Sequence, residues 1–203
     1  MEIDEDKLEN FWRWFVQNEY LIKNAIEQES AIDQTYIVDQ LNNLILEFGR
    51  LTWDIGMDEQ NNWFFTISPN GNQDLVELTE HIIEAAPSHL DWNYYAGKPQ
   101  KNWERTFSLY NNEMEVVEID ANSWYYVAFL EADGTVELII EANNIEHLDP
   151  ETIEIAGNLF LVHELGEKMS LQIVSKVTLV ALLNPDDAAS KYPIADLKEH
   201  LGF

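Results

Sequence analysis

The sequence predicts an α+β fold, with two N-terminal helices followed by two ββαβ units that form antiparallel sheet covered by helices. Three observations support this. Apolar residues recur with the helical period near the N-terminus, the period then changes to two, and the order hairpin, helix, strand occurs twice. Of the 203 residues, 46% are hydrophobic, which is enough to bury a sizeable core. We therefore expect one domain spanning residues 1–203.

Helices are expected at both ends of the chain. Residues 1–50 should form a helical pair, with a first helix over residues 4–28 and a second over residues 33–48 that ends at Gly49. One face of the first helix is apolar at helical spacing and consists of Leu8, Phe11, Trp12, Phe15, Ile22 and Ile26. The C-terminal tail, residues 184–203, should contain a short helix.

The first ββαβ unit is expected over residues 51–97. Its two opening strands alternate apolar and polar residues. Ser68-Pro69-Asn70-Gly71 then has strong turn chemistry, because proline presets φ and glycine accepts a positive φ. A helix over residues 73–86 and a strand over residues 92–96 complete the unit.

A second unit with the same element order is expected over residues 122–183, after a more irregular connection, residues 98–121. Its hairpin turns at Asp133-Gly134, a sequence typical of two-residue hairpin loops. The following helix ends near Gly166, and alternating apolar residues then predict a long strand over residues 169–179. The two units share little residue identity, so a duplication does not follow from the sequence.

The chain is strongly acidic. It has 38 Asp and Glu residues against 11 Lys and Arg, a formal net charge of −27, and residues 106–167 contain fourteen acids and no Lys or Arg. Such a surface repels nucleic acids and anionic membranes and attracts basic proteins. We therefore expect no nucleic-acid or membrane partner, and a basic protein is the partner class that the charge favours.

The arrangement of the acids predicts strands with one solvent-exposed face. Glu113, Glu115 and Glu118 alternate in part with apolar residues, and so do Glu137 and Glu141. Such a face could receive a basic protein or mimic a nucleic-acid backbone towards a nuclease. A surface that only keeps the protein in solution would have the same pattern.

Several classes of chemistry lack their motifs. The chain has no cysteine, which excludes disulfides and thiolate metal sites. In the stretch HELGE, His163 and Glu164 lack the second histidine of a zinc protease, and no phosphate-binding glycine loop is present. The longest near-apolar stretch, residues 177–183, falls far short of the ~20 residues that span a bilayer. We expect a cytoplasmic protein with no catalytic residues, metal or cofactor.

Glu19 is the most unusual single residue, since it projects into the apolar stripe of the first helix. A carboxylate there is paired, protonated or near the end of the buried section. Arg50 or Arg105 would be its natural partner. The residue is either an acid–base group with a shifted pKa or a member of a structural ion pair.

One segment interrupts the acidity, and we name residues 92–105 the aromatic–basic segment. It combines large aromatic and basic side chains, namely Trp92, Tyr94, Tyr95, Lys98, Lys101, Trp103 and Arg105. Loops rich in Trp, Tyr and Arg are typical of binding hot spots. The alternative is a connection whose aromatic residues belong to the core and whose bases pair with nearby acids.

Three short stretches resemble a family of small uncharacterised bacterial α+β proteins. They are FWRWFVQNE, ISPNG with a following helix that ends in EAAP, and WNYYAGKP. The resemblance extends from Phe11 to about Val180 and implies a single compact α+β unit of bacterial type. It implies no activity and no catalytic residues.

For function, the sequence favours a non-enzymatic protein-interaction module with an acidic face, similar to an immunity protein that blocks a basic toxin. The alternative is an enzyme or small-ligand binder with a site near the aromatic–basic segment. Glu19, Tyr94, Trp103 and Arg105 would be its first candidates, provided that they converge in a concave pocket. The sequence leaves the oligomeric state open.

Overall fold

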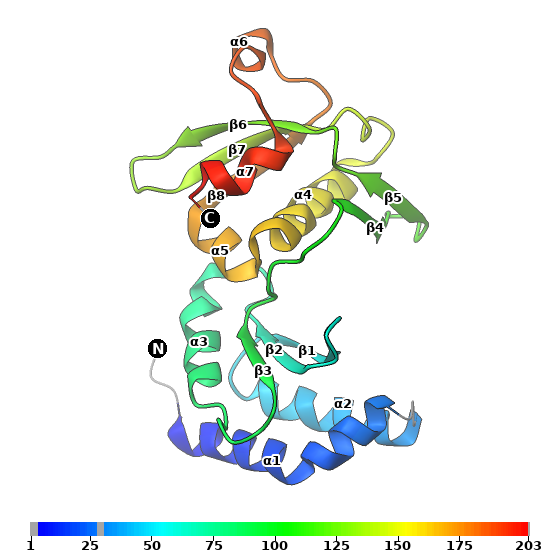
Figure 1. Cartoon of the computed structure of the whole chain (residues 1–203), viewed down its shortest axis with the longest axis vertical. Coiled ribbons are helices and arrows are strands. Elements are labelled where there is room, and N and C mark those ends of the chain that lie inside the picture. Colours follow the sequence, from blue (N-terminus) through cyan, green and yellow to red (C-terminus); the bar gives the residue numbers. More distant parts are fainter. Residues whose placement is uncertain (1–3, 28–30, 203) are drawn as a thin grey trace. The chain divides into compact units, whose positions relative to one another are not determined.

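The computed structural model describes residues 4–27 and 31–202 and confirms a mixed α+β protein (Figure 1). The chain forms two compact units, residues 1–98 and residues 99–203. A single folding domain that includes both units stays a prediction.

Unit 1 begins with two helices, α1 (Glu5–Glu27) and α2 (Ala31–Leu46), which pack against each other. Five of the six residues of the predicted apolar stripe of α1 are buried, with Phe11 and Phe15 fully buried, whereas Ile26 is half-buried. The Trp12 indole N–H donates to the Ile82 carbonyl at 2.9 Å and so joins α1 to a later helix.

The rest of unit 1 is a three-stranded sheet with a helix. The elements are β1 (Thr52–Met57), β2 (Trp63–Ser68), the 3₁₀ turn η1 (Gln73–Leu75), α3 (Val76–Glu84) and β3 (Asn93–Ala96). The strand order is β1-β2-β3, in which β1 and β2 are antiparallel and β2 and β3 are parallel. The expectation of a purely antiparallel sheet is therefore wrong here, because the helical crossover returns the chain in the same direction.

The core of unit 1 is rich in aromatic rings. Phe15 packs 5.1 Å from Phe65 and 5.1 Å from Trp92, measured between ring centroids. Phe11 and Trp12 meet edge to face at 4.7 Å, a preferred geometry for aromatic pairs. These rings join α1 to β2 and to the start of β3.

Unit 2 opens with a hairpin in the segment expected to be irregular. It consists of β4 (Thr106–Tyr110) and β5 (Val116–Asp120), which pair antiparallel as a separate two-stranded sheet. Phe107, Leu109 and Ile119 face the core. The alternation of acids with apolar residues over part of this stretch was the sequence signal for these strands.

The larger sheet of unit 2 has the order β8-β7-β6-β9. Its elements and the helices around it are β6 (Tyr125–Leu130), β7 (Val136–Glu141), α4 (Pro150–Leu165), α5 (Glu167–Ile173), β8 (Val174–Val180), α6 (Pro185–Ala188), β9 (Tyr192–Pro193), η2 (Ile194–Asp196) and α7 (Leu197–His200). β7 pairs parallel with β8, so this sheet is mixed as well. Asp149 caps α4 by accepting the N–H groups of Glu151 and Thr152.

The long strand expected over residues 169–179 is wrong in its first half. Residues up to Ile173 form α5, and β8 begins only at Val174. Gly166, at φ 83°, ends α4 and lets a new helix begin at once. A short segment with alternating apolar residues can still form a helix when tertiary packing favours one.

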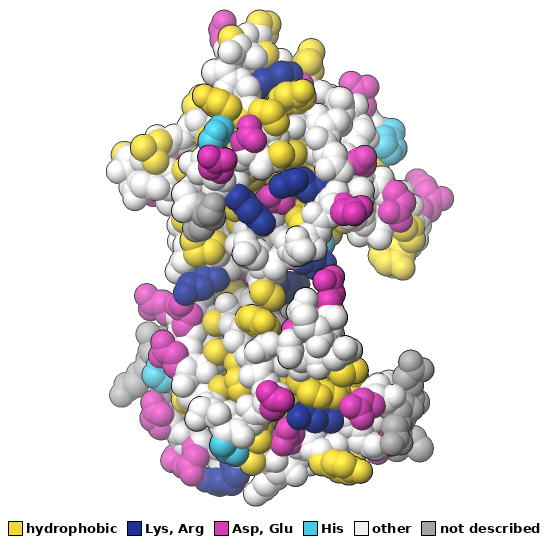
Figure 2. Space-filling model, viewed as in Figure 1, with side chains coloured by type: hydrophobic (Ala, Val, Ile, Leu, Met, Phe, Trp, Pro, Cys, Tyr) yellow, Lys and Arg dark blue, Asp and Glu magenta, His cyan; other side chains and the backbone are white. Residues whose placement is uncertain are grey.

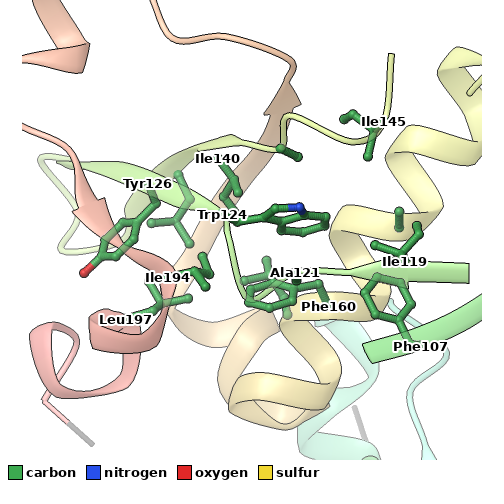
Figure 3. Packing of buried hydrophobic residues seen from close by; sticks show 14 of the residues in the cluster. Phe107, Ile119, Ala121, Trp124, Tyr126, Ile140, Ile145, Phe160, Ile194 and Leu197 are labelled. Atoms are coloured by element: carbon green, nitrogen blue, oxygen red, sulfur yellow. The ribbon is translucent and has the colours of Figure 1, made fainter. Parts of the chain in front are cut away.

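The core of unit 2 surrounds Trp124, as Figure 3 shows. Its ring lies 5.4 Å from that of Phe160 on α4 and 6.5 Å from that of Phe107 on β4. The Trp124 indole N–H donates to Asn144 Oδ1 at 2.8 Å, so its polar atom is satisfied. The β4–β5 hairpin is thereby anchored to the main core through Phe107.

Candidate functional site

Glu19 is paired within its own helix. Its Oε1 accepts a hydrogen bond from Lys23 Nζ at 2.7 Å, one turn further along α1, and from Trp92 Nε1 at 3.1 Å. The expected arginine partner is therefore wrong, because an i,i+4 lysine is closer in the chain than Arg50 or Arg105. The hydrogen bond from Lys23 is the main cause that lowers the pKa of Glu19. The carboxylate is thus ionised at neutral pH.

Lys23 also contacts aromatic rings. Its Nζ lies 5.3 Å from the ring centroid of Trp92 and 5.6 Å from that of Trp63, within cation–π range. The two indoles lie 5.3 Å apart. This group, which we name the Glu19 cluster, consists of Glu19, Lys23, Trp63, Trp92 and Tyr94.

Tyr94 is the member of the Glu19 cluster whose polar atom is not satisfied. Its hydroxyl is buried and has no hydrogen-bond partner among the described residues. Burial raises the pKa of Tyr94 well above its ordinary value, and the charge of Glu19 adds to the rise. An unsatisfied buried hydroxyl is costly, so this position differs from an ordinary core tyrosine.

The structure divides the aromatic–basic segment between the two units. Trp92 is buried, Tyr94 and Tyr95 lie half-buried on β3, and Lys98 is exposed at the end of unit 1. Lys101 is exposed in unit 2, where its backbone N–H donates to the His163 carbonyl at 2.8 Å. The segment is therefore not one continuous patch within either unit.

Trp103 and Arg105 attach the start of unit 2 to α4. Trp103 Nε1 donates to Glu164 Oε2 at 2.9 Å, and Arg105 Nη2 donates to Glu164 Oε1 at 2.8 Å. The Glu164 side chain is wholly buried. The Trp103 ring also packs 4.8 Å from that of His163 and 5.8 Å from that of Phe160. These contacts favour a structural role for both residues.

Glu164 is the central residue that sequence reasoning missed. It was noticed only as part of HELGE, which is an incomplete zinc motif. The available signal was its position on an otherwise apolar stretch of helix, where a carboxylate requires a partner. Arg105 was instead expected, as one of two candidates with Arg50, to pair with Glu19.

The acidic face divides into exposed and buried carboxylates. Glu113, Glu115 and Glu118 are exposed, and Glu137 pairs with Lys176 at 2.8 Å. Glu141 does not lie on a solvent-exposed face, contrary to the expectation. It is buried, accepts the Leu183 N–H at 3.0 Å and pairs with Lys191, because the chain after β8 folds over it. These bonds, above all that from Lys191, lower its pKa.

The described surface has two open depressions of note, one in each unit. In unit 1, a hollow of about 670 Å³ is lined by Trp12, Val16 and acids of α1. In unit 2, one of about 460 Å³ lies at the β6–β7 turn and is lined by Glu131, Asp133 and Lys176. Neither is lined by a member of the Glu19 cluster or of the aromatic–basic segment. Within residues 4–27 and 31–202, no group of three or more His, Asp or Glu residues could hold a metal ion.

The described helices include none that is both long enough and apolar enough to cross a membrane.

Comparisons with protein-family models, with curated proteins and with solved structures each find no match. The resemblance of the three short stretches to a bacterial family therefore stays an expectation, and no residue role is transferred from a relative.

Proposed function

We propose that this chain is a non-enzymatic, cytoplasmic interaction module that binds a basic protein, in the manner of an immunity protein. The observation that carries the proposal is the large surplus of acid. Even if each of the 11 basic residues paired with an acid, 27 carboxylates would remain without a cation from the chain itself.

The placement of the bases supports the same proposal. Arg105, Lys23 and Lys191 are each held by a carboxylate of their own unit. They therefore neutralise local charges and do not create a basic surface. Opposite charges across an interface raise the association rate and suppress wrong partners. A basic partner would therefore associate faster and be selected over other proteins, whereas DNA and RNA are repelled.

The proposal is tested by affinity capture from a bacterial lysate at about 50 mM and about 500 mM salt, between which screening lengths shrink severalfold. The captured protein is then purified and titrated by calorimetry. We expect a basic protein whose affinity falls steeply with salt, and no binding of duplex DNA at either concentration. A purified partner that is acidic, or whose affinity does not change with salt, would contradict the proposal.

A second candidate function is a small-ligand site at the Glu19 cluster, and the unsatisfied hydroxyl of Tyr94 favours it. A polar ligand that accepts this O–H would remove the cost of its burial. The test is a fragment screen by NMR with Tyr94→Phe as the control variant. Hits that shift the Trp92 indole signal and are lost in the variant support a ligand site, whereas the absence of any such hit rejects it.

A further inference from the structure

We infer that the outer face of the β4–β5 hairpin is the surface on which a basic partner docks, through a segment that carries both cationic and apolar side chains. We name this surface the hairpin face and define it by Ser108, Tyr110, Glu113, Met114, Glu115, Val116 and Glu118. The inference rests on the proposed function and assigns it to one place in unit 2.

The first argument is an exposed apolar group at the end of the hairpin. Tyr110 and Val116 are directly paired across the strands and are 61% and 58% exposed, and Met114 in the turn between them is 75% exposed. Figure 2 shows hydrophobic and acidic side chains side by side over this hairpin. Three exposed apolar side chains at one end of a hairpin are more than scattered surface exposure. Tyr is enriched at binding hot spots, and Met suits adaptable contact surfaces.

The second argument is charge. Glu113, Glu115 and Glu118 surround the apolar group, and all three are exposed. No Lys or Arg of the described chain forms an ion pair with them. A hydrophobic centre with an acidic rim is complementary to a basic segment with an apolar anchor.

The third argument is the rigidity of the turn. Asn111 Oδ1 accepts the backbone N–H groups of Glu113 at 3.0 Å and Glu115 at 2.9 Å. Asn112 Nδ2 donates to Asp149 Oδ1, the helix cap of α4, at 2.8 Å. The exposed side chains are thus presented on a turn that is fixed to the body of unit 2. A preorganised surface loses less entropy when it binds.

Met114 occupies its position at a conformational cost. Its φ is 61°, in the left-handed region where glycine or asparagine is favoured. Its side chain is 75% exposed and so adds little packing to the free protein. We therefore attribute its presence at a strained backbone position to contact with the partner.

The test uses three short synthetic peptides and the ¹⁵N-labelled full-length protein at low salt. The first peptide alternates Lys and Leu, the second has Ser in place of Leu, and the third has Glu in place of Lys. We expect the Lys–Leu peptide to shift amide signals of the hairpin face, the Lys–Ser peptide to bind it at least about fivefold more weakly, and the Glu–Leu peptide not to bind.

Two variants then locate the contact. Met114→Gly removes the side chain and suits the backbone, so the fold is retained, and Glu118→Gln removes one charge. Each variant should bind the Lys–Leu peptide about threefold or more weakly than the unchanged protein, which is the size of effect expected of an interface contact. The matched controls lie at the β6–β7 hairpin, where Leu130→Ser removes an 80% exposed apolar side chain and Glu131→Gln removes an exposed charge. Neither control should change binding.

The outcomes separate the two proposals. Amide shifts that centre on another surface, such as the hollow on α1, would show that the hairpin face is not the docking surface. The proposed function, binding of a basic protein, would then still hold. Equal effects of Leu130→Ser and Met114→Gly would also overturn the hairpin face as the docking surface. If neither basic peptide binds anywhere, the hairpin face and the proposed function both fail.

Discussion

Arg105 Nη2 lies 2.8 Å from Glu164 Oε1, which joins the first residues of unit 2 to the buried face of α4. Arg105 also has a φ of 55°, in the left-handed region that non-glycine residues rarely adopt. The pair removes one cation, Arg105, from the surface charge of the aromatic–basic segment. One of its three bases already balances a buried carboxylate.

Loss of this pair should destabilise unit 2. In Glu164→Ala, the half-buried guanidinium of Arg105 loses its anion and the Trp103 indole loses its acceptor. We expect a loss of about 3 kcal/mol in the free energy of unfolding, as for other broken buried pairs. Chemical denaturation followed by circular dichroism measures it.

The matched control is Glu154→Ala, because Glu154 is an exposed residue of the same helix and the substitution is identical. Its effect should stay within about 0.5 kcal/mol. Equal effects of the two variants would show that the Arg105–Glu164 contact is not a stabilising feature.

Gly157 lies where α4 packs closely on β8. A Cβ at this position would lie 2.7 Å from Leu179 Cδ1, closer than side chains pack. Gly157→Ala should therefore destabilise the protein by about 1–3 kcal/mol, although alanine is the better helix former by about 1 kcal/mol. The neighbouring exposed Asn158→Ala should be neutral or stabilising. A Gly157→Ala protein with a raised melting temperature would refute the close contact.

The turn at Met114 should gain stability from a residue that accepts a positive φ. Met114→Asn keeps the hairpin and relieves a backbone cost of about 1 kcal/mol. We expect a higher melting temperature together with weaker binding of a basic partner. The control introduces the same residue at a strand position: Val116→Asn should lower the melting temperature because asparagine is disfavoured in strands. A drop in stability for Met114→Asn would contradict the assigned turn conformation.

Acid should weaken unit 1 in part through Glu19. Its folded-state pKa is below the ordinary value of 4.5, with the hydrogen bond from Lys23 as the main cause. The stabilisation is thus present above about pH 4.5 and is lost as the pH falls through the lowered pKa. Glu19→Gln should flatten this part of the stability–pH curve. The measurement is thermal unfolding of both proteins at pH values about one unit apart, from about pH 3 to about pH 7. An unchanged curve would mean that Glu19 has the same pKa in the unfolded chain.

The sequence predicts the elements better than their pairing. The apolar stripe of α1 and the turn at Asp133-Gly134 specify a helix and a hairpin through local patterns alone. The expected two-residue loop is wrong, because Glu131 and Thr135 still share a backbone hydrogen bond and residues 132–134 form the loop. Parallel pairing of β7 with β8 is a tertiary event that the period of two does not encode. For the same reason, α5 was predicted as strand, since a seven-residue helix is determined mostly by its packing.

The candidate site shows the same limit. The composition of residues 92–105 indicated a hot spot, but side-chain partners distant in sequence decide the outcome. Glu164 lies 59 residues after Arg105, and Trp92 lies 73 residues after Glu19. No local pattern distinguishes such pairs from alternatives. The surplus of acid, which depends only on composition, could be established from the sequence.

The most direct test of the central claim is the salt dependence of binding to a purified basic partner. The account predicts that log Kd rises steadily with log salt concentration, and that Glu118→Gln reduces the slope while Glu131→Gln does not. The account would be contradicted by an affinity that is independent of salt, or by a slope that neither substitution changes.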